Sequence, residues 1–139
     1  MLCVLQVWVL TGDKEETAVN ISYSAGHFAT DMTEIRLTQC HSDDAVGLQL
    51  DHLEQMWVDL GTIFTCTSTV IERLHGKFPF FRIEAGSGRR FALVMDGMSL
   101  KFALDPIHTP RLRRICLSVV TVLCCRMSPL QKAQVCVAS

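Results

Sequence analysis

The chain has 139 residues, of which 49% are hydrophobic and 19% are charged, and its formal net charge is −1 at pH 7. This length suits one domain, and this composition excludes a disordered, acidic-tail or collagen-like chain. The longest apolar run, residues 115–125, is shorter than the roughly 18–20 residues that a membrane helix needs. The sequence therefore predicts one globular domain and no membrane-spanning helix.

The small net charge hides an uneven distribution. Residues 1–60 contain two Lys or Arg and ten Asp or Glu, whereas residues 61–139 contain eleven Lys or Arg and four Asp or Glu. Two interpretations stay open: the halves are electrostatically complementary parts of one fold, or the second half presents a basic surface to an anion. From the charges alone we favour the first interpretation.

Seven cysteines are many for this length, but their pattern is not typical of a secreted disulfide scaffold. Their number is odd, Cys124 and Cys125 are adjacent, and Cys3, Cys116 and Cys136 lie in apolar stretches. No Cys-x-x-Cys pair gives the spacing of a zinc site, and the five histidines are scattered. We therefore expect buried free thiols in a reducing compartment and no metal site.

The first predicted element is a strand. Residues 2–10 are nearly continuous in Val and Leu, which is typical of a strand buried on both faces of a parallel sheet. This stretch lacks the basic region and the cleavage site of a signal peptide. After the turn at residues 11–13, a helix is predicted at 14–21, where an acidic first turn suits the helix dipole.

The middle of the chain is harder to interpret. Residues 34–37 predict a short strand, and residues 43–60 predict an amphipathic helix because apolar side chains recur every three or four positions. The β-branched run at 62–71 is compatible with a strand or with a continuing helix. Residues 76–90 indicate a basic loop, because proline and glycine interrupt any regular element.

The last third alternates strands and helices. The predicted elements are a strand at 91–95 that ends at Asp96-Gly97, a short helix at 99–104, a helix that begins at Pro110, a strand at 120–125 and a helix at 129–137 that begins with proline. Strands that alternate with helices predict a parallel sheet with helices on both faces. The predicted fold class is therefore α/β.

Polar residues follow the predicted strands at their carboxyl ends, where open parallel sheets bind ligands. Thr11 offers a hydroxyl group, Gly12 lets a ligand approach the backbone, and Asp13 can hold a cation or orient a water molecule. Arg126 follows the last strand, and Lys132 lies in the next helix, so both can supply positive charge to phosphate oxygens. By residue type, this set suits a phosphate group together with Mg²⁺.

Each of these residues also has a purely structural interpretation. Residues 11–13 can form an ordinary turn in which Asp13 caps the following helix. Arg126 and Lys132 can be solvated surface charges. Asp96-Gly97 is a common turn pair to which we assign no chemistry. Taken one at a time, these structural interpretations are the better ones.

Three segments together resemble one protein family. They are residues 5–21 (LQVWVLTGDKEETAVNI), residues 96–104 (DGMSLKFAL) and residues 122–133 (VLCCRMSPLQKA). In this order and spacing they are similar to segments of the type IV P-type ATPases, the phospholipid flippases. The resemblance covers nearly the whole chain, whereas residues 27–90 match poorly and are expected to be a variable insert.

The resemblance implies a fold and a set of roles. Residues 1–139 would be a single, partial phosphorylation domain with a haloacid-dehalogenase-like, Rossmann-type parallel sheet and flanking helices. Thr11, Gly12 and Asp13 would contact the nucleotide phosphates or the phosphoryl group, and Arg126 and Lys132 would neutralise its charge. The implied cofactors are ATP and Mg²⁺.

The resemblance also implies a parent protein. That parent would be a multi-pass membrane protein that couples ATP hydrolysis, through an aspartyl-phosphate, to phospholipid movement, with an accessory subunit as a partner. This chain would lie on the cytosolic face of the membrane. We expect no nucleic acid as a partner.

Two family motifs do not occur in these 139 residues: the Asp-Lys-Thr-Gly-Thr motif of the nucleophile and the Mg²⁺-binding Gly-Asp-Gly-x-Asn-Asp motif. Without its aspartate the phosphoenzyme cannot form, so we expect a soluble or unstable fragment with no catalytic residue, no Mg²⁺ ligands and no activity of its own. One alternative is a non-catalytic α/β nucleotide- or phosphate-binding regulatory module. Another is a chain that does not fold alone, because the family's nucleophile-bearing strand would be missing from the sheet.

Overall fold

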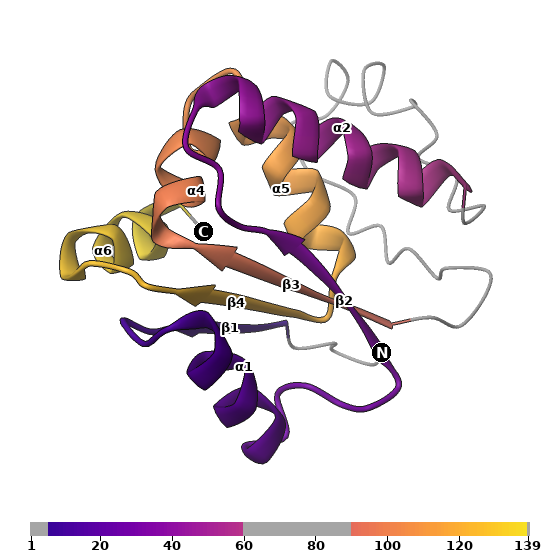
Figure 1. Ribbon diagram of the computed structural model, residues 1–139, viewed down its shortest axis with the longest axis vertical. Helices are drawn as coiled ribbons and strands as arrows, with labels where there is room; N and C mark the ends of the chain where they lie inside the picture. The colour runs from indigo at the N-terminus through magenta and orange to yellow at the C-terminus, as the bar shows by residue number, and fades with distance from the viewer. Residues whose placement is uncertain (1–5, 60–89, 139) are drawn as a thin grey trace, which may run out of the picture.

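The computed structural model describes residues 6–59 and 90–138 (Figure 1). The elements in chain order are β1 (Val7–Leu10), α1 (Glu15–Ser24), β2 (Met32–Leu37), α2 (Asp43–Asp59), β3 (Arg90–Asp96), α4 (Gly97–Ala103), α5 (Thr109–Ser118), β4 (Thr121–Cys125) and α6 (Pro129–Ala138). Within these two ranges, no helix has the length and apolar character needed to cross a membrane.

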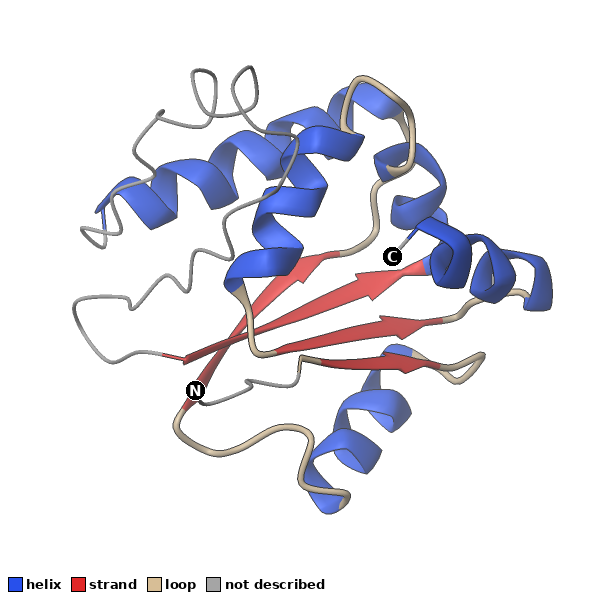
Figure 2. Ribbon diagram, turned by 180° about the vertical axis from the view of Figure 1, so that it is seen from behind, coloured by secondary structure: helices blue, strands red, loops and turns tan. Residues whose placement is uncertain are grey.

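The described strands form one parallel sheet in the order β1-β4-β3-β2. All arrows point the same way, so the carboxyl ends of the strands lie along one edge (Figure 2). Helix α1 covers one face, α2, α4 and α5 cover the other, and α6 lies beside the carboxyl ends (Figure 1). This four-stranded α/β sheet is consistent with a partial Rossmann-type, haloacid-dehalogenase-like fold and confirms the predicted class.

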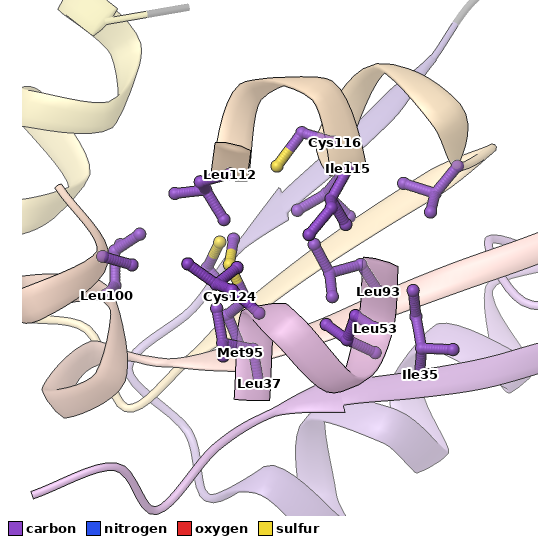
Figure 3. Packing of buried hydrophobic residues seen from close by; sticks show 14 of the residues in the cluster. Ile35, Leu37, Leu53, Leu93, Met95, Leu100, Leu112, Ile115, Cys116 and Cys124 are labelled. Atoms are coloured by element: carbon purple, nitrogen blue, oxygen red, sulfur yellow. The ribbon is translucent and has the colours of Figure 1, made fainter. Parts of the chain in front are cut away.

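Strand β3 is buried on both faces and separates two hydrophobic clusters. Leu93 and Met95 belong to the larger cluster, which lies under α2, α4 and α5, whereas Ala92 and Val94 belong to the smaller one, which lies over α1. Figure 3 shows Leu93 close to Ile115 of α5, and Met95 beside Leu37 and Cys124. Successive side chains of a strand point to opposite faces, so an apolar run is required here. Each such fully buried aliphatic side chain contributes about 1.5–3 kcal/mol.

Part of the expected variable insert, residues 27–90, is integral to this core. It supplies β2, which pairs with β3 over Met32 to Leu37, and α2, whose Val46 and Leu50 are fully buried. The predicted strand and amphipathic helix of this region are both confirmed, and the strand begins two residues earlier than expected. The expectations for residues 62–71 and 76–89 lie outside the described residues.

Strand β1 differs from its prediction. Within the described part of the chain it lies at an edge of the sheet, where β4 is its one neighbouring strand, and all four of its residues are half-buried. The expectation of a strand buried on both faces is therefore wrong for Val7–Leu10, and residues 2–5 lie outside the described part. An apolar run is compatible with burial, but the number of neighbouring elements decides how much burial occurs.

The described cysteines mostly follow the expectation of buried free thiols, whereas Cys3 and Cys66 lie outside the described residues. Cys40, Cys116, Cys124 and Cys125 are buried and free, whereas Cys136 on α6 is exposed, so the expectation is wrong at that position. Burial raises the pKa of Cys116 to about 12 and that of Cys125 to about 11. Because only the thiolate is nucleophilic, these two thiols are expected to be inert at neutral pH.

Ion pairs connect the acidic and basic halves of the chain. Among the described residues, ion pairs that join the halves are Arg90–Asp31 at 2.7 Å, Arg111–Glu54 at 3.0 Å, Arg111–Asp51 and Arg114–Glu54 at 3.6 Å, and a hydrogen bond joins His108 to Asp43 at 2.9 Å. Most lie at the surface, where a single pair adds at most about 1 kcal/mol. Their distribution nevertheless supports the interpretation that the two halves are complementary parts of one fold.

Candidate functional site

The four strand ends form a continuous edge, here termed the carboxyl edge. It consists of residues 11–13 after β1, residues 126–128 after β4, Asp96-Gly97 at the end of β3 and residues 38–40 after β2. Four of the five predicted site residues, Thr11, Gly12, Asp13 and Arg126, lie on it directly. Lys132 lies in the first turn of α6, where its backbone N–H donates to the carbonyl of Ser128 at 3.1 Å.

Backbone hydrogen bonds join the ends of β1 and β4. The N–H of Thr11 donates to the carbonyl of Cys124 at 2.9 Å, which extends the β1–β4 ladder past the last residue of β1. The N–H of Met127 then donates to the carbonyl of Thr11 at 3.0 Å, and the N–H of Arg126 donates to the carbonyl of Asp13 at 2.9 Å. Residues 113 positions apart in the sequence thus become direct neighbours.

The side chains of the β1–α1 turn bond to each other. Asp13 donates its N–H to the hydroxyl oxygen of Thr11 at 3.1 Å, and that hydroxyl donates to Oδ2 of Asp13 at 3.0 Å. The residue that caps α1 is Lys14, and no side chain forms a capping hydrogen bond there. The interpretation of Asp13 as a helix cap is therefore wrong. Its exposed carboxylate is held toward Thr11 instead.

Gly12 is exposed and is not required by packing. A Cβ atom at this position would lie 3.5 Å from the carbonyl oxygen of Met127, an ordinary van der Waals distance. The space that a side chain would fill is therefore open, which is compatible with a ligand that approaches the backbone at Gly12.

The carboxyl edge includes two cationic side chains, those of Arg126 and Lys132. Among the described residues, neither Arg126 nor Lys132 forms a salt bridge, although other arginines do so. Arg126 is exposed and Lys132 is half-buried. No hydrogen bond within the described ranges links the Lys132 side chain to residues 11–13, so the structure brings Lys132 to the edge only through its helix. An arrangement of unpaired cations favours an anion such as phosphate.

Arg126 has an unusual backbone conformation. Its φ angle is +50°, in the left-handed region that non-glycine residues rarely occupy. Such a conformation costs about 1–3 kcal/mol and persists only where the surrounding structure enforces it. Gln39, which follows β2 on the same edge, has a φ of +59°.

Asp96 and Gly97 organise the middle of the carboxyl edge. Oδ1 of Asp96 accepts from the N–H of Ser99 at 2.8 Å and caps α4, while Oδ2 accepts from the N–H of Gln39 at 2.9 Å. Asp96 is buried, so its two hydrogen-bond partners stabilise a carboxylate that has little contact with water. This turn pair therefore has a specific structural role that its sequence alone does not indicate.

Gln131 is a residue at this edge that the sequence reasoning missed. Its backbone N–H donates to Oγ of Ser128 at 3.3 Å, and its Oε1 accepts from the N–H of Ser128 at 3.1 Å. The available signal was the Ser-x-x-Gln pattern of residues 128–131, which is typical of a capping box at a helix start. Its Nε2 also donates to the carbonyl of Gly97 at 2.6 Å, a contact that no local pattern predicts.

The described side chains of the carboxyl edge provide few ligands for a metal ion. No group of three or more His, Cys, Asp or Glu side chains within the described ranges is placed to hold a metal. Mg²⁺ commonly binds through one or two carboxylates together with substrate phosphates and water. Asp13 can supply one such carboxylate, and the remaining ligands would have to come from ATP and water.

Comparison with known proteins finds relatives over nearly the whole chain. No family model matches the chain. Human phospholipid-transporting ATPase ID is 36% identical over 134 residues, which cover 96% of the chain and 11% of the relative. Mouse phospholipid-transporting ATPase FetA is 33% identical over 131 residues, which cover 94% of the chain and 11% of the relative. Human probable phospholipid-transporting ATPase IM is 32% identical over 134 residues, which cover 96% of the chain and 11% of the relative.

These matches extend over nearly the whole chain, but the chain spans only about a tenth (11%) of the length of each of these relatives. The chain therefore belongs, as one segment, to the type IV P-type ATPases, the family of the phospholipid-transporting ATPases.

Proposed function

We propose that the carboxyl edge of this chain handles the phosphates of ATP within the phosphorylation domain of a phospholipid-transporting ATPase. The observation that carries this proposal is the hydrogen bond from the Arg126 N–H to the Asp13 carbonyl at 2.9 Å. It joins the turn at residues 11–13 to the start of α6. Hydroxyl, carboxylate and cationic groups from two distant segments thereby share one edge of a parallel sheet, where such folds bind phosphate ligands.

Each residue would have a distinct part. The Thr11 hydroxyl would donate to a phosphate oxygen, Gly12 would leave room for that oxygen, and Asp13 would orient Mg²⁺ or water. Arg126 and Lys132 would neutralise the phosphate charge, which is the main task of a protein in phosphoryl transfer. The start of α1 cannot do this alone, because its first turn contains Glu15 and Glu16.

For the whole protein we propose ATP-driven phospholipid translocation, with ATP and Mg²⁺ as cofactors, an accessory subunit, and this segment on the cytosolic side of the membrane. Residues 1–139 would then be part of the phosphorylation domain. The names of the relatives support phospholipid transport, since each is a phospholipid-transporting ATPase. The chain by itself would bind ATP without hydrolysing it, because its sequence contains no Asp-Lys-Thr-Gly-Thr motif.

Isothermal titration calorimetry of the 139-residue chain with ATP, with and without Mg²⁺, tests this proposal. We expect Arg126→Ala and Lys132→Ala each to weaken ATP binding by about tenfold, the usual effect of losing a charged hydrogen-bond donor. Arg113→Ala removes the same charge from an exposed position on α5 and serves as the control. A cooperative thermal melt of each variant shows that it is folded.

Two results would contradict the proposal. One is a cooperatively folded chain that binds no ATP at millimolar concentration. The other is equal ATP affinity of Arg126→Ala, Lys132→Ala and Arg113→Ala. Mg²⁺-dependent ATP hydrolysis by the chain that disappears in Lys132→Ala would leave the site in place but overturn the expectation that the chain is inactive.

A further inference from the structure

The left-handed conformation of Arg126 requires neighbours that enforce it. Three consecutive backbone N–H groups after β4 have identified partners. Those of Arg126 and Met127 donate to the carbonyls of Asp13 and Thr11, and that of Ser128 donates to Oε1 of Gln131 at 3.1 Å. Strand β1 therefore holds one side of this turn, and the Gln131 side chain holds the other.

The same Gln131 side chain reaches a third strand end. Its Nε2 donates to the carbonyl of Gly97 at 2.6 Å, at the point where β3 passes into α4. A Cβ atom at position 97 would lie 2.5 Å from the carbonyl oxygen of Arg126 and 2.7 Å from Oε1 of Gln131. Only glycine permits this approach, so the carbonyl of Arg126, the backbone of Gly97 and the amide of Gln131 form one tight contact.

We propose that Gln131 is a positioning residue for the phosphate site. Its amide links Gly97 to Ser128 and thereby holds Arg126 in the left-handed conformation. In this conformation the Arg126 guanidinium would contact the phosphate. This inference rests on the proposed function of the carboxyl edge and deepens it. Glutamine suits the role because one amide donates to Gly97 and accepts from Ser128 at the same time. An ionised glutamate accepts but cannot donate.

The consequence is that the site depends on three strand ends. Strands β1 and β4 carry the proposed phosphate contacts, and the end of β3 sets the geometry of the β4 turn through Gly97 and Gln131. A change at Gln131 would therefore weaken phosphate binding without removing any group that touches phosphate. Its effect would pass entirely through Arg126.

A double-mutant cycle measured by calorimetry with ATP tests this route. We expect Gln131→Ala to weaken ATP binding by about tenfold in the unaltered chain, as loss of the Arg126 contact would. In the Arg126→Ala background, the same substitution is expected to have no further effect. Gln134→Ala, an exposed glutamine on the same helix, is the matched control and is expected to bind ATP normally.

The outcomes separate the two proposals. If Gln131→Ala weakens ATP binding equally in both backgrounds, or not at all, Gln131 does not act through Arg126 and the positioning role is wrong, while the proposed function stands. If Arg126→Ala leaves ATP binding unchanged, the proposed function of Arg126 fails, and the positioning role for the phosphate site fails with it.

Amide hydrogen exchange gives a second readout that needs no ligand. In Gln131→Glu, which keeps the acceptor for Ser128 but loses the donor to Gly97, we expect the amides of Arg126 and Met127 to exchange about tenfold faster. The amide of Leu93 in the centre of the sheet is expected to be unchanged. Unchanged exchange at Arg126 and Met127 would show that the turn is not loosened, and a uniform increase that includes Leu93 would show only general destabilisation. Either result would overturn the positioning role.

Gln131→Glu is also expected to regain ATP affinity when its introduced carboxyl group is protonated. Below the pKa of the introduced carboxyl group, the protonated acid can again donate to the Gly97 carbonyl. The ratio of its ATP affinity to that of the unaltered chain is therefore expected to rise as the pH falls through that pKa. A ratio that does not change with pH would contradict the role of the donated hydrogen bond.

Discussion

Gly97 and Arg126 approach each other so closely that a Cβ atom on Gly97 would lie 2.5 Å from the carbonyl oxygen of Arg126. Real Cβ atoms do not make contacts this short, and the neighbour is backbone, which cannot rotate away as a side chain can. The end of β3 and the turn after β4 are therefore packed backbone to backbone. This contact fixes the end of β3 against the turn after β4.

Gly97→Ala is expected to destabilise the protein by about 1–3 kcal/mol, because the added methyl group would displace the Arg126 carbonyl or the Gln131 amide. Urea denaturation followed by circular dichroism measures this change. Gly12→Ala is the control, since its Cβ would lie at an ordinary 3.5 Å from the nearest backbone atom. Equal stability of the two variants would show that the turns can separate at little cost.

The control variant carries a prediction of its own. Gly12→Ala is expected to leave the free energy of unfolding nearly unchanged but to weaken ATP binding by about tenfold, because its methyl group would occupy the space proposed for a phosphate oxygen. Calorimetry with ATP and a urea titration of the same preparation measure both quantities. Normal ATP affinity in this variant would place the phosphate away from Gly12.

Asp96→Ala is expected to destabilise the protein by about 2–4 kcal/mol, since it removes the cap of α4 and leaves the N–H of Gln39 without its carboxylate partner. The matched control is Asp31→Ala, which removes an exposed ion pair with Arg90 and is expected to cost less than about 1 kcal/mol. Urea denaturation of both variants gives the comparison. A smaller loss for Asp96→Ala than for Asp31→Ala would contradict the role of Asp96.

The buried thiols predict a pH dependence of stability. Burial raises the pKa of Cys116 to about 12 from its ordinary value of 9.0, so the folded chain keeps this thiol protonated where the unfolded chain ionises it. The unfolded state then binds fewer protons, and the free energy of unfolding falls as the pH rises from about 9 toward 12, by at most about 1.4 kcal/mol per pH unit for one thiol. Below pH 9 this contribution is fully present.

Urea denaturation between pH 8 and about 10.5 measures that slope. In Cys116→Ala, the free energy of unfolding is expected to fall less steeply above pH 9, because the variant lacks the Cys116 thiol. This difference in slope is independent of the absolute stability of the variant. Cys136→Ala is the control, because Cys136 is exposed. If the two variants show the same slope as the unaltered chain, the Cys116 thiol does not resist ionisation in the folded state.

Local sequence patterns predicted most of the described secondary structure correctly. The apolar spacing of residues 43–60 predicted α2, the run at 91–95 predicted β3, and the proline at 129 predicted the start of α6. These signals succeed because helix periodicity, the apolar run of a strand and the fixed φ of proline are local properties of the sequence. The turn residues 11–13 and Arg126 were likewise recognised as polar groups that follow strands.

The sequence by itself determined the α/β class, the free thiols and the family, because composition, periodicity and motif order are properties of the chain alone. Only the tertiary structure decided that β1 is a half-buried edge strand, that Asp13 bonds to Thr11 and does not cap α1, and that Gln131 links Gly97 to the Arg126 turn. The first and third of these facts depend on the strand order β1-β4-β3-β2, which places residues from distant parts of the chain side by side, whereas the Thr11–Asp13 bond forms within one turn. Hydrogen bonds between such residues leave no local pattern, since each partner is chosen by the packing of the whole sheet.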